Sequence, residues 1–148
     1  MKVVLQRVSY AEVKIDNETV GKIDRGILVL VGIKDTDIDD ENKITKMADK
    51  IVNMRIYEDD NDKMNLSLKD IDGELLVISN FTLYGDASHG NRPSYIEAAR
   101  PEVAEPYYDK FVNELKNKGI KKVETGKFGG DMKVSLLNDG PVTIVYEL

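Results

Sequence analysis

The sequence predicts an α+β fold, a mainly antiparallel or mixed β-sheet curled towards a barrel with two amphipathic helices, in one domain spanning residues 1–148. Residues 2–15 alternate between apolar and polar side chains, as a half-buried strand does. Residues 26–33 are continuously apolar and bounded by glycines, which is typical of a strand covered on both faces. Two stretches, 44–52 and 103–115, carry apolar residues at helical spacing.

The first strand, residues 2–15, contains one residue that does not fit its pattern. Arg7 falls on the side that carries the strand's apolar residues. Arginine is rarely buried without a partner. Two interpretations stay open: an edge position where the stem of Arg7 reaches out to water, or a buried arginine that holds another group in place.

The next elements follow in order along the chain. A turn is expected at 16–18, followed by a return strand at 19–23 and the apolar strand described above. The acidic run 39–41 suits the positive end of the first helix dipole. This helix is predicted from a stripe of Ile44, Met47, Ala48, Ile51 and Val52. Residues 57–73 are polar, and turns are expected at 59–62 and 72–73.

Residues 74–84 are predicted as a strand that is apolar until Ser79, Asn80 and Thr82 interrupt it. Strand geometry would send Ser79 and Phe81 to one face, and Asn80 and Thr82 to the other. Polar groups at the end of a buried strand need partners, because each one left dry costs on the order of 1–3 kcal/mol. They either bond to neighbouring strands or form a site.

The last third of the chain begins with a glycine-containing loop at 85–94. Pro101 suits the first turn of the second helix, and Gly119 suits the position just after its end. The tail predicts strands near 121–125, 132–137 and 142–147. The composition of Asn138-Asp139-Gly140-Pro141 predicts a turn between the last two.

The composition excludes several kinds of site. There is no cysteine and one histidine, His89, so disulfides, thiolate nucleophiles and Cys/His zinc sites are excluded, and no metal or other cofactor is expected. The net charge of −6 argues against a broad nucleic-acid-binding face, although the basic residues between 116 and 133 leave a few phosphate contacts open. No apolar run approaches the ~20 residues of a membrane span, and no signal-peptide layout is present. We therefore expect a cytoplasmic protein with no membrane partner.

The usual nucleophile and phosphate motifs are missing as well. A serine or threonine needs an adjacent base, and no G-x-S-x-G elbow presents one. The glycines at 126–130 match neither the Walker loop nor the dinucleotide fingerprint, although a generic phosphate-binding loop stays open.

Five separated segments, taken together and in order, resemble the D-aminoacyl-tRNA deacylase family. They are Val4-Leu5-Gln6-Arg7-Val8, Ser79-Asn80-Phe81-Thr82-Leu83-Tyr84, Gly90-Asn91-Arg92-Pro93-Ser94-Tyr95, Thr125-Gly126-Lys127-Phe128-Gly129 and Asn138-Asp139-Gly140-Pro141-Val142-Thr143-Ile144. The resemblance runs along the whole chain, which makes it specific. It implies a homodimeric hydrolase, without cofactor, that cleaves the ester between a D-amino acid and the 3′ acceptor end of tRNA. Such an enzyme proofreads in translation quality control.

The resemblance also implies roles for individual residues. Ser79, Asn80, Phe81 and Thr82 would form the catalytic pocket, with Met132 in its lining. Gly140 and Pro141, joined by a cis bond, would enter the pocket of the partner subunit at the dimer interface. Arg7 would hold the carbonyls of this Gly-Pro pair in orientation.

In this scheme the enzyme selects its substrate by rejecting the wrong one. Two carbonyl oxygens accept the substrate ammonium group, an L side chain collides with them, and a D side chain points to solvent. Glycine, which has no side chain, is expected to be accepted. Backbone N–H groups around Phe81 and Thr82 would stabilise the oxyanion while a ribose hydroxyl assists the water. Thr82 as a covalent nucleophile is the minority alternative.

One position departs from the family pattern. The segment usually reads Ser-Gln-Phe-Thr-Leu, and Asn80 replaces the glutamine, which draws the amide back by roughly 1.5 Å. We expect the fold and the dimer to be retained and catalysis to be the part affected. Two other functions stay open: a related proofreading deacylase with relaxed chirality, and an inactive module that binds the tRNA end.

Overall fold

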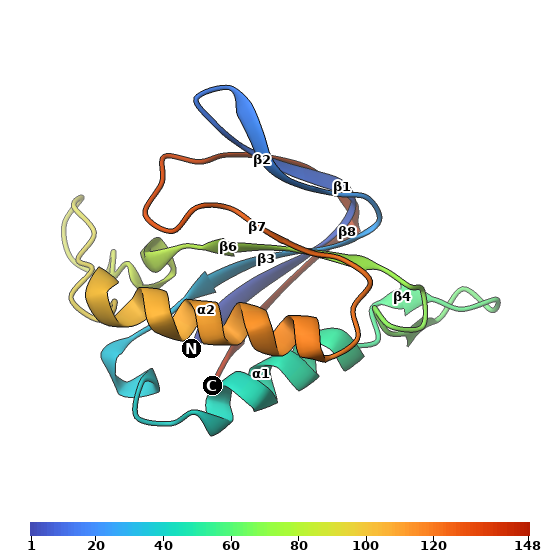
Figure 1. Cartoon of the computed structure of the whole chain (residues 1–148), viewed down its shortest axis with the longest axis horizontal. Helices are drawn as coiled ribbons and strands as arrows, with labels where there is room; N and C mark the ends of the chain where they lie inside the picture. Colours follow the sequence, from blue (N-terminus) through green and yellow to red (C-terminus); the bar gives the residue numbers. More distant parts are fainter.

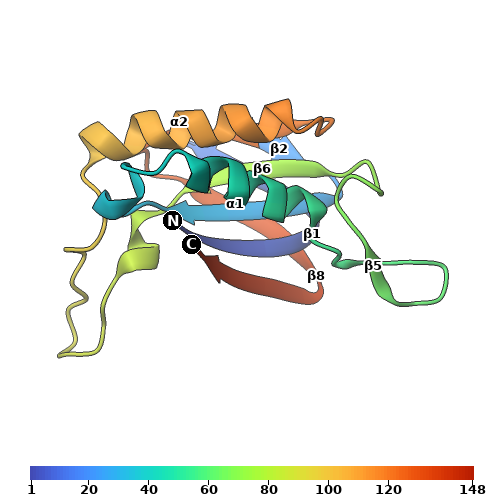
Figure 2. The same cartoon turned by 90° about the horizontal axis from the view of Figure 1, so that it is seen from below.

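The computed structural model describes all 148 residues as a mixed six-stranded sheet, a small hairpin and two helices on one face of the sheet (Figures 1 and 2). The strands of the sheet are β1 (Lys2–Ile15), β2 (Glu18–Ile23), β3 (Gly26–Gly32), β6 (Glu74–Ser79), β7 (Val123–Thr125) and β8 (Lys133–Glu147). The hairpin is β4 (Tyr57–Glu58) and β5 (Met64–Leu66), and the helices are α1 (Asn42–Asn53) and α2 (Pro101–Asn117). Two 3₁₀ turns are η1 (Asp35–Asp37) and η2 (Phe81–Tyr84).

The sheet order is β2-β1-β3-β6-β7, and β8 pairs with β1. β3, β6 and β7 run parallel, whereas β1 is antiparallel to β2, β3 and β8. The predicted fold class is therefore confirmed. None of the helices is both long enough and apolar enough to cross a membrane.

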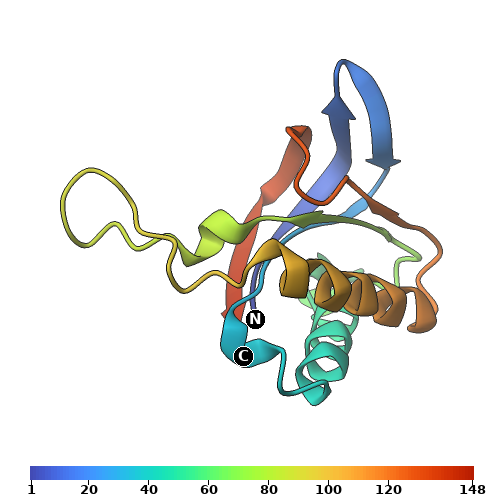
Figure 3. The same cartoon turned by 60° about the vertical axis from the view of Figure 1, so that its left-hand side comes forward.

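The sheet curls until β2 meets β7 (Figure 3). A Cβ atom on Gly21 of β2 would lie 2.5 Å from the carbonyl oxygen of Thr125, so only glycine permits this approach. Lys122 Nζ donates to the carbonyl of Lys22, 2.6 Å away. A small core fills the curl, formed by Val8, Ala11, Val13, Ile23, Leu28, Leu76 and Ile78. The predicted curl towards a barrel is confirmed.

The main core lies between the sheet and the two helices. The predicted stripe of α1 is buried along its whole length, and α2 buries Tyr107, Tyr108, Phe111 and Leu115 against the same core. Gly119 follows α2 with a φ of +79°, as predicted for a helix end. The hydrophobic periodicity thus located both helices correctly.

The prediction of a strand over 74–84 is wrong beyond Ser79. β6 ends there, and Asn80 becomes the N-cap of η2, where its Oδ1 accepts a hydrogen bond from the Thr82 N–H. A short amide side chain that bonds to the backbone two residues ahead favours a turn over a strand. The two-face arrangement expected for residues 79–82 therefore does not exist.

The predicted turn at 138–141 is also wrong, because β8 continues through it. Gln6 of β1 lies opposite Thr143, and Val8 lies opposite Asn138, so residues 139–142 bulge out opposite Arg7 alone. Asn138 closes the bulge: its Oδ1 accepts from the Val142 N–H at 3.1 Å, and its Nδ2 donates to Thr143 Oγ1 at 2.8 Å. The turn-forming residues produce a bulge, since the chain on both sides stays paired with β1.

Candidate active site

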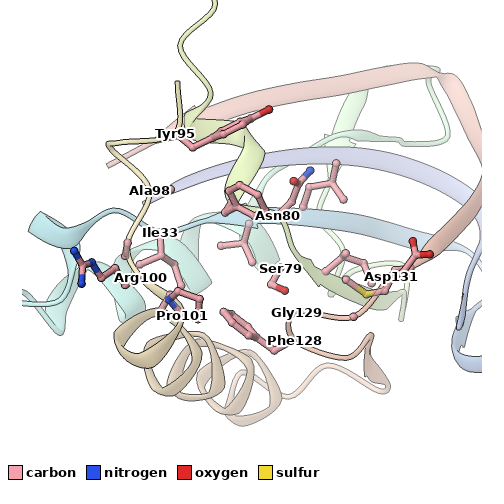
Figure 4. A pocket seen from close by; sticks show the side chains of 18 of the residues that line it. Ile33, Ser79, Asn80, Tyr95, Ala98, Arg100, Pro101, Phe128, Gly129 and Asp131 are labelled. Atoms are coloured by element: carbon pink, nitrogen blue, oxygen red, sulfur yellow. The ribbon is translucent and has the colours of Figure 1, made fainter. Parts of the chain in front are cut away.

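A largely apolar pocket of about 810 Å³ opens where β6 ends, between η2, the start of α2 and the loop before β8 (Figure 4). Ser79, Asn80 and Phe81 line it from β6 and η2, and Met132 lines it from the far end of the chain. Four residues expected at the site from the sequence are thus brought together. Thr82 is exposed and is not part of the pocket lining.

Asn80 controls which polar groups are free at this end of β6. Its Oδ1 accepts from both the N–H and the hydroxyl of Thr82, and its own N–H donates to Val31 at 2.8 Å. The hydroxyl of Thr82 therefore donates to an amide oxygen and not to a base. The N–H of Phe81 occupies the first position of η2, where no acceptor exists within the helix.

An aromatic pair borders the pocket. The ring of Phe81 is 56% exposed and meets Tyr95 edge to face, with centroids 5.2 Å apart. Tyr95 precedes the short segment that leads to Arg100 and Pro101, both of which line the pocket, and Phe128 lies across it (Figure 4). Sequence reasoning did not assign these residues to the site, because loop residues carry no periodic signal. Only the resemblance of segments 90–95 and 125–129 to the family indicated that Tyr95 and Phe128 belong to functional parts of the chain.

The pocket is lined by no histidine and by a single carboxylate. Its ionisable lining residues are Tyr95, Arg100 and Asp131, and Asp131 pairs with Lys133 at 2.7 Å. His89 lies on the exposed loop, with its Nδ1 2.8 Å from Ser88 Oγ. No group of three histidine or carboxylate side chains is arranged to hold a metal ion.

The basic stretch between 116 and 133 is largely neutralised in the folded chain. Lys118 pairs with Asp49 and Glu114, both at 2.9 Å. Lys121, Lys122 and Lys133 also have carboxylate partners. Contact with many phosphates through this stretch is therefore not favoured.

Arg7 is buried, with 4% of its surface exposed, so it does not reach out to water. Its Nε donates to the carbonyl of Asp139 at 3.0 Å, and its Nη1 donates to the carbonyl of Ile56 at 2.7 Å and to the carboxylate of Glu58 at 2.9 Å. The second interpretation of Arg7, an arginine that holds a group in place, is correct. The carbonyl that it holds is that of Asp139, whereas the resemblance implied the carbonyls of Gly140 and Pro141.

Gly140 and Pro141 form the exposed tip of the bulge. The peptide bond between them is cis, and Gly140 has a φ of +127°. A Cβ at Gly140 would lie 2.9 Å from Val142 Cγ2 and 3.0 Å from Arg7 Nη2. The backbone conformation and the close contact with Arg7 both require glycine at this position.

The bulge and the pocket lie apart within one protomer. Arg7 pairs with Ile27 near the start of β3, whereas Ser79 pairs with Val31 near its end, and four residues of strand span about 13 Å. The bulge lies on β8, which pairs with β1 and not with β3 or β6. The structure therefore does not bring Gly140 and Pro141 to the pocket of their own chain.

Comparison with known proteins gives a consistent result. Residues 4–147 match the family model described as D-Tyr-tRNA(Tyr) deacylase. The chain is 56% identical over 147 residues to a D-aminoacyl-tRNA deacylase of Flavobacterium psychrophilum, which covers 99% of this chain and 97% of that protein. It is 55% identical to a D-aminoacyl-tRNA deacylase of Lactobacillus acidophilus, with all of both chains covered.

Two solved structures share the fold. One is described as c-Myc DNA unwinding element binding protein, with a TM-score of 0.90, 38% identity, and coverage of 100% of this chain and 99% of that one. The other is described as a probable eukaryotic D-amino acid tRNA deacylase, with a TM-score of 0.85 and coverage of 99% and 98%. Its identity is 16%, so it supports the fold alone.

Proposed function

This chain belongs to the D-Tyr-tRNA(Tyr) deacylase family and is a D-aminoacyl-tRNA deacylase, a hydrolase; from that premise we propose how its site selects and cleaves the substrate. The active unit in this proposal is a homodimer with two sites at the subunit interface. In each site the Gly140-Pro141 tip of one protomer completes the pocket of the other. The observation that carries the proposal is the position of that tip, which is exposed, held by Arg7 and remote from its own pocket.

The β8 edge supports a dimer. β8 pairs with β1 on one side only, and an unpaired strand edge readily associates with another chain. Leu137 and Val145 on this strand are 54% and 65% exposed, and they flank the bulge in sequence. An interface over this edge would cover both side chains and carry the Gly140-Pro141 tip towards the partner.

The chirality filter follows from what the tip presents. A Gly-Pro segment offers carbonyl oxygens and little side-chain bulk, so it can accept hydrogen bonds from a substrate ammonium group. With the ammonium held there, an L side chain would collide with the carbonyls, whereas a D side chain would point away. Glycine would pass the same filter, because it has no side chain to reject.

The chemistry in this proposal needs little from the protein. An aminoacyl ester is already activated, and the N–H of Phe81, which has no acceptor within η2, would stabilise an oxyanion. A neighbouring ribose hydroxyl would assist the attacking water, since the one carboxylate that lines the pocket, Asp131, is paired with Lys133. The Thr82 N–H can act as a second donor only when Asn80 releases it.

The pocket suits the terminal nucleoside of tRNA. Its lining is apolar and includes Phe128 and Met132, against which a base can pack, and Arg100 lies at one side where a phosphate would follow. Binding the acceptor end alone is compatible with a net charge of −6. We place this activity in translation proofreading in the cytoplasm.

Deacylation of D-Tyr-tRNA, L-Tyr-tRNA and Gly-tRNA by the purified protein tests the proposal. We expect rapid release of D-tyrosine and glycine and little release of L-tyrosine. Equal rates on the two tyrosine esters would rule out chiral rejection and favour a deacylase with relaxed chirality. Binding without turnover would favour the inactive binding module.

A further inference from the structure

We propose that Glu58 is a positioning residue for chiral selection, an inference that rests on the proposed function. Glu58 lies in β4 of the small hairpin, outside the pocket lining, and its carboxylate bonds to Arg7 and not to the Gly140-Pro141 tip. It would act through Arg7. By holding the guanidinium of Arg7, Glu58 would keep Nε within hydrogen-bond distance of the Asp139 carbonyl. The hairpin thereby becomes part of the chirality filter.

The contacts place Arg7 between the hairpin and the bulge. Both carboxylate oxygens of Glu58 lie 2.9 Å from Arg7 Nη1, and the carbonyl of Ile56 lies 2.7 Å from the same atom. At the other end of the guanidinium, Nε donates to the carbonyl of Asp139. Because a guanidinium is planar and rigid, holding Nη1 sets the direction in which Nε points.

The hairpin is itself anchored at this point. Tyr57 is fully buried, its hydroxyl donates to the carbonyl of Gly26 at 2.8 Å, and its ring lies near the guanidiniums of Arg7 and Arg25, at 5.9 and 5.4 Å. Glu58 follows this anchored residue directly. The carboxylate that holds Arg7 is therefore attached to a well-supported backbone.

A competing carboxylate explains why Glu58 matters. The side chain of Asp139 lies on the bulge, and its Oδ2 is 3.6 Å from Arg7 Nε. With Glu58 in place, Nη1 is occupied, and Nε bonds to the Asp139 carbonyl. Without the Glu58 charge, Arg7 would turn towards the Asp139 carboxylate. That shift would release the Asp139 carbonyl and reorient the peptide before Gly140.

The test is a comparison of kcat/KM for D-Tyr-tRNA and L-Tyr-tRNA in full-length variants. In Glu58→Gln we expect the D-to-L ratio to fall on the order of tenfold, the scale of losing one charge-assisted hydrogen bond. In the double variant Glu58→Gln/Asp139→Asn, removal of the competing carboxylate should restore most of the ratio. Glu105→Gln, an exposed change on α2 with no ion pair, is the matched control and should leave the ratio unchanged.

The D-to-L ratio of the wild-type protein distinguishes a failure of the proposed function from a failure of the role of Glu58. A wild-type protein that does not prefer the D ester contradicts the proposed function, and the role of Glu58 falls with it. If the wild-type protein prefers the D ester, an unchanged ratio in a folded Glu58→Gln variant overturns the role of Glu58 alone. An equal loss on both esters with a lower Tm also overturns it, because it shows a purely structural contribution.

Discussion

The guanidinium Nε of Arg7 lies 3.0 Å from the carbonyl oxygen of Asp139 and donates a hydrogen bond to it, at the place where the register of β1 and β8 breaks. This bond ties a buried charge to the residue that precedes Gly140. It turns what would be a loose bulge into a supported one. The expected behaviour of the bulge follows from this contact.

Gly140→Ala should abolish chiral selection. The added Cβ would meet Val142 and Arg7 at about 3 Å, and the residue would have to keep a φ of +127°, so the tip must shift. We expect the D-to-L ratio of kcat/KM to collapse. Gly90→Ala is the control, since Gly90 also has a positive φ but no atom within 4 Å of its Cβ position, and it should keep the ratio. A normal ratio in Gly140→Ala would contradict the role of the tip.

Asn80→Gln should raise kcat and lower stability. A longer amide cannot cap η2 as well, at a cost of about 1 kcal/mol in unfolding free energy, and it regains the roughly 1.5 Å of reach that Asn80 lacks. Asn80→Ala loses the same cap but supplies no amide, and it should lose stability without the same gain in kcat. Single-turnover kinetics and urea unfolding measure both. Unchanged turnover in Asn80→Gln would show that this position does not limit catalysis.

Thr82→Ala should retain a kcat within about tenfold of the wild-type value. The hydroxyl donates to Asn80 and has no neighbouring base, so its loss removes a turn contact and not a nucleophile. Thr82→Ser keeps the hydroxyl and serves as the reference. A loss of about a thousandfold or more in Thr82→Ala alone would indicate covalent catalysis by Thr82.

Asp37→Asn should destabilise the fold in a pH-dependent way. Asp37 is fully buried and accepts hydrogen bonds from the Lys34 N–H, Lys43 Nζ and the Met1 ammonium group. Burial raises the pKa of Asp37, but these hydrogen bonds together hold it below its ordinary value. We expect a loss of about 3 kcal/mol in unfolding free energy at pH 7, as for a broken buried ion pair.

The sign of the pH effect follows from that lowered pKa. The contribution of Asp37 is present above the unfolded-state pKa of about 3.9 and is lost as the pH falls through the folded-state value. The difference between wild-type protein and Asp37→Asn should therefore shrink as the pH falls below about 4. Urea unfolding followed by circular dichroism from pH 7 to pH 3 measures it. A constant difference across that range would contradict the assignment.

The sequence predicted those parts of the fold whose periodicity reflects burial. β1, β3 and the stripe of α1 are elements in which one face or both faces meet a core, so their side chains record the structure. The C-terminal end of β6 and the middle of β8 were predicted wrongly for two separate reasons. A single side-chain hydrogen bond from Asn80 decides the first, and pairing with the distant strand β1 decides the second.

The candidate site was likewise predicted only in part from the sequence. Ser79 and Phe81 belong to a segment that resembles the family, the resemblance also implied Met132, and the structure places all three at one pocket. The pairing of Arg7 with Glu58 could not be predicted from the sequence, because Glu58 lies in a polar stretch whose composition indicates only a surface hairpin. Contacts between a buried strand and such a hairpin depend on the tertiary fold, and they have no signature in the local sequence.

Activity in a mixed dimer distinguishes a tip that completes the partner's pocket from a tip that serves its own chain. Ala98→Trp should fill the pocket, and Gly140→Ala should spoil the tip, so each homodimer should fail to select D-Tyr-tRNA over L-Tyr-tRNA. In a heterodimer of the two, one site combines both defects, and the other combines an intact pocket with an intact tip. We predict that co-expressed, doubly tagged and purified heterodimers recover roughly half of the wild-type D-specific activity, since one of two sites is whole. A heterodimer with no more D-specific activity than either homodimer would show that the tip serves its own chain, and would contradict a site shared between the two protomers.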